Sequence, residues 1–295
     1  MWVTGFLRFA RETHHPSPIT LRGIRVSCCA LLLLASGGTA AQVPADAYQP
    51  VPGQPGKDVV WIPTPEDTVE KMLDMARVTS RDYVIDLGSG DGRNVIAAAR
   101  RGARALGVEY NPELVALSKR AAAAAGVSGK ATFVQGDMFE SDISQATVLM
   151  LFLLPDHLSR LAPKFLKLRP GARIVSNTYS IDGGWEPDDS TRGEPCTSWC
   201  VAMMYVVPAQ AAGAWRLADG STLTLEQQFQ KVSGTLDVDG IALPLENGRL
   251  LGEEIRFTAN RVDHTGRISG DTMSGSANGR TIRTWSATRT ESGEK

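Results

Sequence analysis

The sequence predicts an α/β fold built on a parallel sheet, followed by a small all-β module at the C-terminus. Three observations lead to this prediction. Short apolar segments alternate with helical segments through residues 61–208, short strand-like runs and turns fill residues 214–290, and the composition changes between them, near residues 209–213. With 295 residues, 42% of them hydrophobic, the chain can bury a core in each of these two parts.

The first part contains five short, mostly apolar strands separated by helices. The predicted strands are residues 83–87, 105–108, 132–135, 147–153 and 173–177. The predicted helices begin at Pro65 and then span residues 94–101, 112–125 and 158–168. Continuous apolar strands that alternate with helices are typical of a parallel sheet covered on both faces. Such a sheet binds its ligand at the carboxyl ends of the strands, where the strand order reverses.

The second part contains six strand-like runs and no convincing helix. The runs are residues 223–229, 234–238, 241–245, 254–258, 267–269 and 284–288. Val232-Ser-Gly, Ile268-Ser-Gly and Met273-Ser-Gly recur between or beside them and are interpreted as turns. We therefore expect an antiparallel meander that closes into a small sandwich or barrel. It is predicted to be a separate binding or docking module, and a lid over the acceptor site is the alternative.

Residues 1–41 are predicted to be a targeting segment rather than part of the fold. Arg22 and Arg25 precede an apolar run at residues 26–35, and small residues follow up to Ala40 and Ala41. This order is typical of a secretory signal, so we expect export to the periplasm or the medium. A retained membrane anchor and a mitochondrial presequence are the alternatives, although the run is short for a membrane span. Residues 42–60 are rich in proline and are predicted to be an extended leader.

The cysteine content and the net charge limit which metal ions and macromolecules the chain is expected to bind. Cys196 and Cys200 are the cysteines that remain after removal of the targeting segment, and in an exported protein such a pair favours a disulfide. A zinc site would need two further ligands, so no metal site is predicted. The formal net charge is −1 and no run of Lys or Arg is present, so a nucleic-acid partner is not expected.

A glycine-rich turn connects the first predicted strand to the following helix. It contains Gly88, Ser89, Gly90 and Gly92. Glycines let the backbone approach a ligand closely, but a nicotinamide-binding loop reads Gly-x-Gly-x-x-Gly, and here Arg93 stands where its third glycine would be. Asp86 precedes the turn, where its charge is unsuited to a pyrophosphate. A carboxylate suits a cationic ammonium group, such as that of the methionine moiety of S-adenosyl-L-methionine.

Two further acids follow the next two strands. Glu109 ends the second strand, where its carboxylate can accept hydrogen bonds from both hydroxyls of a ribose. Asp137 ends the third strand, where it can accept from an adenine amino group. The neighbouring residues predicted to complete this site are Tyr110, Asn111, Met138 and Phe139. One such acid alone is more often a helix cap or a solvated loop residue, but three at successive strand ends predict a site for S-adenosyl-L-methionine.

Four segments resemble a known family. They are Trp61-Ile-Pro-Thr-Pro, Asp86-Leu-Gly-Ser-Gly-Asp-Gly-Arg, Gly107-Val-Glu-Tyr-Asn and Gly136-Asp137. They are similar to the Rossmann-like class I methyltransferases, in particular to the small mitochondrial and bacterial protein-lysine methyltransferases, over residues 58–190. The resemblance implies S-adenosyl-L-methionine as cofactor and a protein lysine as methyl acceptor. A small-molecule methyltransferase and a non-catalytic protein that binds an adenosyl ligand are the alternatives.

The acceptor side of the site is less specific. The fourth strand ends in Phe152-Leu-Leu-Pro and lacks the Asn or Asp, followed by Pro-Pro, that is usual in enzymes that methylate base or amide nitrogens. The residues interpreted as an apolar wall for an alkyl amine are Leu154, Pro155, Tyr179 and Trp185. Packing at the strand end is an equal alternative for the first two. Asp156, His157 and Tyr179 are weak catalytic candidates for acid–base roles, and Trp199 is predicted to be a packing residue.

Overall fold

The computed structural model describes residues 48–193 and 198–290, which belong to one unit of the fold. The predicted targeting segment and Cys196 lie outside the described residues. Within the described part of the chain, none of the helices is long and apolar enough to cross a membrane.

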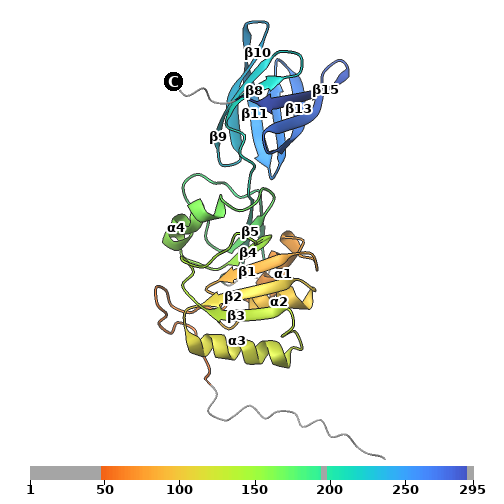
Figure 1. Cartoon of the computed structure of the whole chain (residues 1–295). Coiled ribbons are helices and arrows are strands. Elements are labelled where there is room, and N and C mark those ends of the chain that lie inside the picture. The colour runs from red at the N-terminus through yellow and green to blue at the C-terminus, as the bar shows by residue number, and fades with distance from the viewer. Residues whose placement is uncertain (1–47, 194–197, 291–295) are drawn as a thin grey trace, which may run out of the picture. The chain divides into compact units, whose positions relative to one another are not determined.

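A seven-stranded sheet forms the first part of the fold (Figure 1). Its strands are β1 (Tyr83–Leu87), β2 (Arg104–Glu109), β3 (Ala131–Gln135), β4 (Val148–Leu151), β5 (Arg173–Asn177), β6 (Asp189–Arg192) and β7 (Val201–Val206). Their order is β3-β2-β1-β4-β5-β7-β6. The pairs among β1 to β5 are parallel, whereas β7 runs antiparallel to both β5 and β6. The strand order therefore reverses between β1 and β4, which is where such sheets bind ligands.

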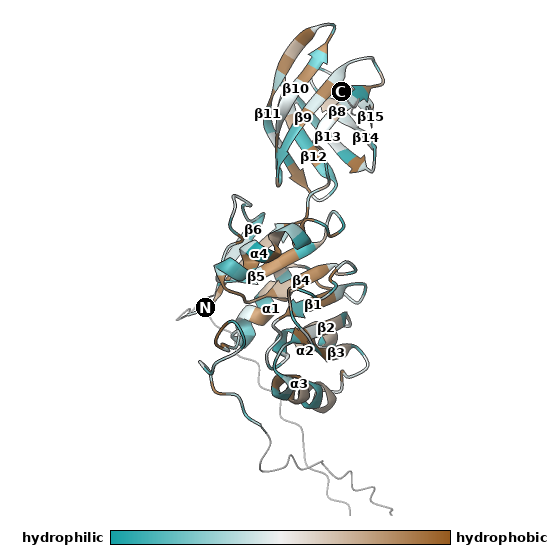
Figure 2. Cartoon of the chain, turned by 60° about the vertical axis from the view of Figure 1, so that its left-hand side comes forward, coloured by the Kyte–Doolittle hydropathy of each residue, from teal (hydrophilic) through white to brown (hydrophobic). Residues whose placement is uncertain are grey.

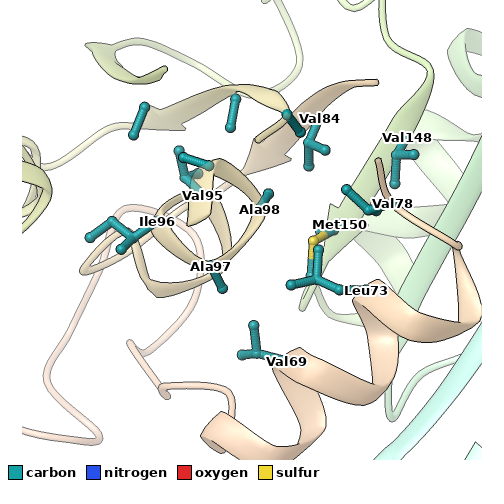
Figure 3. Close-up of a cluster of buried hydrophobic side chains, with 14 of the residues drawn as sticks. Val69, Leu73, Val78, Val84, Val95, Ile96, Ala97, Ala98, Val148 and Met150 are labelled. Atoms are coloured by element: carbon teal, nitrogen blue, oxygen red, sulfur yellow. The ribbon is translucent and has the colours of Figure 1, made fainter. Parts of the chain in front are cut away.

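Helices cover both faces of this sheet because successive side chains of a strand point to opposite sides. The helices are α1 (Glu66–Met75), α2 (Arg93–Arg100), α3 (Pro112–Ala124) and α4 (Pro155–Phe165). Val84 and Met150 pack with buried residues of α1, α2 and α3 on one face (Figure 3). Their neighbours Ile85 and Leu149 pack with α4 on the other face. The predicted parallel α/β sheet is thus confirmed.

Two strands of the sheet were not predicted. The sequence prediction stops at β5, whereas the structure continues into β6 and β7. β6 has the sequence Asp-Ser-Thr-Arg and is largely exposed, so it carries no apolar pattern that would identify a strand. The fourth helix begins at Pro155, three residues before the predicted start, and contains Pro163.

The C-terminal part is a closed antiparallel barrel. Its strands are β8 (Gly213–Leu217), β9 (Thr222–Gln228), β10 (Lys231–Val238), β11 (Ile241–Leu251), β12 (Glu254–Ala259), β13 (Val262–Ser269), β14 (Thr272–Asn278) and β15 (Ile282–Arg289). Hydrophilic and hydrophobic residues mix along these strands (Figure 2). Trp215, Leu223, Ile255 and Phe257 are among the buried side chains of its core. The predicted all-β module is confirmed, and its form is a barrel.

The barrel has eight strands rather than the six predicted runs, because β8 and β14 were missed. Val232-Ser-Gly and Met273-Ser-Gly lie inside β10 and β14, so their interpretation as turns is wrong. Glycine is required there by close strand pairing. A Cβ atom at Gly234 or Gly275 would lie 1.9 Å from a backbone carbonyl oxygen of the paired strand.

The segment before β6 contacts the barrel. Phe229 stacks on Trp185, with ring centroids 5.6 Å apart and an interplanar angle of 8°. Arg249 Nη2 lies 2.7 Å from Asp188 Oδ1, and Gln230 Nε2 donates a hydrogen bond to a backbone carbonyl oxygen of this segment at 2.6 Å. The barrel therefore shares both apolar and ionic contacts with the sheet.

Candidate active site

A cavity of about 270 Å³ lies at the carboxyl ends of the parallel strands. Residues at or just after the ends of β1, β2 and β3 line one part of it, and they include Gly88, Glu109, Tyr110, Asn111, Asp137 and Met138. Residues that follow β4 and β5 or precede β7 line another part, and they include Phe152, Leu154, Tyr179 and Trp199. The cavity thus spans the point at which the strand order reverses.

The proline-rich leader forms a further wall of this cavity. Residues 54–60 of the leader line the cavity together with Trp61 and Ile62, and an antiparallel bridge joins Pro55 to Val60. The backbone N–H of Trp61 donates to the carbonyl oxygen of Gln54 at 2.9 Å, which closes the turn. The prediction of a merely extended leader is therefore wrong for this segment. Proline spacing alone did not indicate that the chain folds back toward the strand ends.

The glycine-rich turn brings backbone close to the cavity. Gly88, Gly90 and Gly92 have φ angles of 74°, 55° and 82°, in the left-handed region that favours glycine. A Cβ atom at Gly90 would lie 2.5 Å from the indole nitrogen of Trp61, so a larger residue does not fit. Of the predicted residues in the turn, Gly88 lines the cavity, while Ser89 is buried behind it.

Asp86 lies behind the turn rather than at the cavity wall. Its side chain is buried, and Asn94 Nδ2 donates to its Oδ2 at 3.0 Å. Burial raises the pKa of Asp86 well above its usual value, and the nearby charges of Glu109 and Asp91 raise it further. A cationic group bound beside Asp86 would stabilise its ionised form against both burial and the nearby negative charges. The predicted ammonium partner carries such a charge.

Glu109 couples the glycine-rich turn to the end of β2. Its Oε2 accepts a hydrogen bond from the backbone N–H of Gly90 at 2.9 Å, and its Oε1 accepts from that of Asn111 at 2.9 Å. Each carboxylate oxygen has further acceptor capacity, and Glu109 lines the cavity. This arrangement fits the predicted role of binding ribose hydroxyls.

Asp137 has a partner that the sequence did not predict. Lys57 Nζ donates to its Oδ2 at 2.5 Å and lies 4.6 Å from the centroid of the Tyr110 ring, while the backbone N–H of Phe139 donates to Oδ1 at 2.8 Å. The hydrogen bond from Lys57, followed by the one from Phe139, lowers the pKa of Asp137. Nothing in the leader sequence marked Lys57 as a site residue.

Phe139 and two of the catalytic candidates do not line the cavity. The Phe139 ring lies edge-on to that of His157, with centroids 5.8 Å apart, and the guanidinium of Arg160 covers it at 3.7 Å. Asp156 is exposed in the first turn of α4. Of the three candidates, Tyr179 alone is a cavity residue.

The predicted apolar wall is corrected at three positions. Trp185 is 2% exposed and packs against Phe229 and Tyr205, so it is not a wall residue. Trp199, predicted to be a packing residue, lines the cavity and is 37% exposed. Leu154 lines the cavity as expected, whereas Pro155 begins α4.

Comparison with known proteins identifies the family of this chain. The model of the ANTKMT methyltransferase domain matches residues 86–189. A protein-lysine N-methyltransferase from Saccharolobus islandicus is 41% identical over 152 residues, which are 50% of this chain and 94% of that protein. The chain belongs to the protein-lysine N-methyltransferase family. The adenine nucleotide translocase lysine N-methyltransferase of Mus musculus is another relative of this methyltransferase, 38% identical over 121 residues, which are 40% of this chain and 52% of that protein.

A solved structure is also similar to this methyltransferase. It is described as an RNA methyltransferase from Salinibacter ruber in complex with S-adenosyl-L-homocysteine. It is 41% identical and covers 51% of this chain and 96% of that chain, with a TM-score of 0.48.

Family membership confirms the predicted class, activity and cofactor. The enzyme is a class I methyltransferase that uses S-adenosyl-L-methionine. The residues of the first part of the cavity fit this cofactor, because Glu109 offers acceptors for hydroxyls and Val108, Leu114 and Met138 offer an apolar lining for a base. The individual roles of Asp86, Glu109 and Asp137 remain predictions.

Proposed function

We propose that this methyltransferase transfers the methyl group of S-adenosyl-L-methionine to the ε-amino group of a lysine in a protein. The observation that carries this proposal is the continuity of the cavity across the reversal between β1 and β4. One part presents carboxylates and glycine backbone for the cofactor, and the other presents aromatic and aliphatic side chains suited to an alkyl chain. The relatives named as protein-lysine methyltransferases support the same acceptor.

The reaction requires alignment more than chemical assistance from the protein. Bound S-adenosyl-L-methionine would supply an electrophilic methyl group on a sulfonium. The lysine ammonium would first lose a proton to solvent. Its nitrogen lone pair would then form the new N–C bond as the C–S bond breaks, with the electrons of that bond going to the sulfur and the positive charge to the methylated nitrogen. The cavity residues contribute by holding the donor and the acceptor in line and by excluding water.

A transfer assay with radiolabelled S-adenosyl-L-methionine would test the proposal. The full chain is incubated with a panel of proteins, small amines and RNA, and labelled protein is digested for mass spectrometry. We expect label on lysine in protein and none after the lysines are blocked by acetylation. A variant with Gly90→Ala serves as the matched control, because it obstructs the cofactor turn.

Three outcomes would contradict a protein-lysine acceptor. Label on small amines alone would indicate a small-molecule methyltransferase, and label on RNA alone would indicate a nucleic-acid acceptor. Absence of label throughout, with S-adenosyl-L-methionine still bound, would favour a protein that binds an adenosyl ligand without catalysis.

We also propose that the chain is exported. The order of basic, apolar and small residues before Gln42 supports a secretory signal, and Cys200 is disulfide-bonded, which is usual in oxidising compartments. The mature N-terminus, determined by mass spectrometry after cell fractionation, should lie near residue 41. A full-length chain that still begins at Met1 in the cytoplasm would contradict export.

A further inference from the structure

Three aromatic rings gather in the part of the cavity assigned to the acceptor. The ring centroids of Phe152 and Trp199 are 5.7 Å apart, and the ring of Tyr179 lies 6.3 Å from each of them. Phe152 and Tyr179 stack at an interplanar angle of 24°, while Trp199 is tilted by about 50° from both. We name these three rings the aromatic clamp.

The clamp is built by the ends of three neighbouring strands. Phe152 follows β4 and Tyr179 comes two residues after β5, so both lie at the carboxyl edge of the sheet. β7 runs antiparallel to β5, which brings its beginning to the same edge and places Trp199 there. The rings therefore converge through strand order and register, although the first and the last are 47 positions apart in the sequence.

Backbone hydrogen bonds fix the loops that carry two of the rings. Ser176 Oγ donates to the carbonyl oxygen of Tyr179 at 2.7 Å, and the backbone N–H of Thr178 donates to the carbonyl oxygen of Val201 at 2.6 Å. Gly193 N–H donates to the carbonyl oxygen of Cys200, the residue after Trp199, at 2.8 Å. A clamp held in this way loses little conformational entropy when a ligand enters it.

The chemistry of the clamp suits a cation rather than a neutral alkyl group. Aromatic faces attract ammonium groups through the negative potential above the ring, and several faces together recognise methylated ammonium groups. The cation–ring contacts among the described residues involve Tyr110, Tyr83, Phe139 and Trp215, and none of the clamp rings. Trp199 is 37% exposed and lines the cavity, so its ring is accessible to a ligand.

We infer that Phe152, Tyr179 and Trp199 form a subsite that binds the alkylammonium group of the acceptor, including its methylated forms. This inference rests on the proposed function and specifies how that function selects its acceptor. The clamp holds the ammonium at the cavity until its proton is lost to solvent. Because methylation enlarges the ammonium and weakens its hydration, the product of one transfer is also a ligand of the clamp and can be methylated again.

Binding of choline and of its uncharged isostere 3,3-dimethyl-1-butanol would test the clamp directly. Both probes have the same shape, so a difference in affinity reports the charge. The full chain, saturated with S-adenosyl-L-homocysteine, is titrated with each probe and followed by NMR. We expect choline to bind roughly 3- to 30-fold more tightly, the range of a partly to fully desolvated cation–π contact.

Two substitutions of Trp199 distinguish the effect of its aromatic ring from the effect of its volume. Trp199→Leu should reduce the preference for choline, whereas Trp199→Phe should retain most of it. The affinity for S-adenosyl-L-homocysteine should be unchanged in both variants, which shows that each is folded. Equal binding of the two probes to the unsubstituted protein, or an undiminished preference in Trp199→Leu, would overturn the inference.

The choline titration and the transfer assay together distinguish the clamp from the proposed function. If choline is preferred and label appears on small amines but not on protein lysine, the clamp stands and the acceptor is a smaller amine. If protein lysine is methylated but the two probes bind equally, the lysine function stands and the clamp inference is overturned.

Discussion

Replacement of Asp86 by asparagine should raise the stability of the cofactor-free protein and weaken cofactor binding. Asp86 is 2% exposed, and the hydrogen bond that the described structure gives its carboxylate comes from Asn94 Nδ2. The other polar atom of that amide, Asn94 Oδ1, is buried with no hydrogen-bond partner in the described structure. In Asp86→Asn, the new amide can accept from Asn94 Nδ2 and donate to Asn94 Oδ1, so it satisfies both atoms.

The gain in stability should depend on pH. Burial raises the pKa of Asp86 in the folded protein above its value in the unfolded chain. Between these two values the folded state binds more protons than the unfolded state, so the free energy of unfolding falls as pH rises through this window. Asn does not ionise, so Asp86→Asn removes this decrease in the free energy of unfolding. An unsatisfied buried polar group costs about 1–3 kcal/mol, so the melting temperature at neutral pH should rise by roughly 2–4 °C for each kcal/mol gained.

The effect on cofactor binding should have the opposite sign. A hydrogen bond between a carboxylate and an ammonium contributes about 1.5–3 kcal/mol, so Asp86→Asn should weaken S-adenosyl-L-methionine binding by roughly 10- to 100-fold. Calorimetry gives the dissociation constant, and thermal unfolding without ligand at several pH values gives the stability. Unchanged affinity would show that Asp86 only anchors the turn. A lower melting temperature at neutral pH would refute the argument from burial.

Three further predictions concern other parts of the sheet domain. Gly90→Ala should abolish measurable S-adenosyl-L-methionine binding in calorimetry, because φ is 55° and the added Cβ would lie 2.5 Å from Trp61 Nε1; ordinary affinity would contradict this. For Asp82, burial raises the pKa, but hydrogen bonds from Thr147 and Thr79 and the charge of Arg173 outweigh it, so the pKa is lowered. Asp82→Asn should therefore cost about 1–3 kcal/mol at pH 7, and denaturant unfolding should show this difference shrinking as pH falls through the native pKa. In exported protein, Cys196 and Cys200 should be linked, and two free thiols in non-reducing mass spectrometry would contradict the pairing.

The sequence predicts the cofactor part of the site better than the acceptor part. Asp86 precedes the last residue of β1, Glu109 ends β2, and Asp137 lies two residues after β3. The apolar residues of each strand identify it, so the local pattern is sufficient to propose all three acids. Parallel pairing then brings the strand ends to one edge without further information. The prediction therefore needed no knowledge of contacts between distant residues.

The acceptor part depends on long-range pairing that local pattern does not contain. Trp199 reaches the cavity because β7 pairs antiparallel with β5, and β7 was not predicted. Lys57 meets Asp137 across 80 positions of sequence, through a turn in a segment that proline content alone marked as extended. Trp185 was placed in the cavity by its position after β5, yet it packs into the core beside Phe229 of the barrel. A bulky aromatic residue in the sequence indicates burial, but it does not indicate which part of the structure the side chain packs against.

A truncation after Gln210 tests whether the barrel belongs to the catalytic unit. The residues that line the cavity all precede β8, the first strand of the barrel, so cofactor affinity should survive the deletion. The stability of the protein should decrease, for two reasons. Removal of Phe229 exposes the stacked face of Trp185. Removal of Arg249 leaves Asp188, whose side chain is 4% exposed, without its ion-pair partner.

Arg249→Ala in the full chain distinguishes the effect of losing the ion pair from the effect of losing the stacked rings. It removes the ion pair but keeps the stacked rings, and loss of one partner of a buried pair costs about 3–5 kcal/mol. Asp188 also accepts from the backbone N–H of Val206 at 2.8 Å and solvent reaches Arg249, so we expect a smaller cost, about 1–3 kcal/mol. Calorimetry of both variants should give unchanged binding of S-adenosyl-L-methionine, and thermal unfolding should place Arg249→Ala between the full chain and the truncation. Loss of cofactor binding in Arg249→Ala, whose barrel is otherwise intact, would show that the barrel supports the cavity through this contact and that the two parts are one catalytic unit.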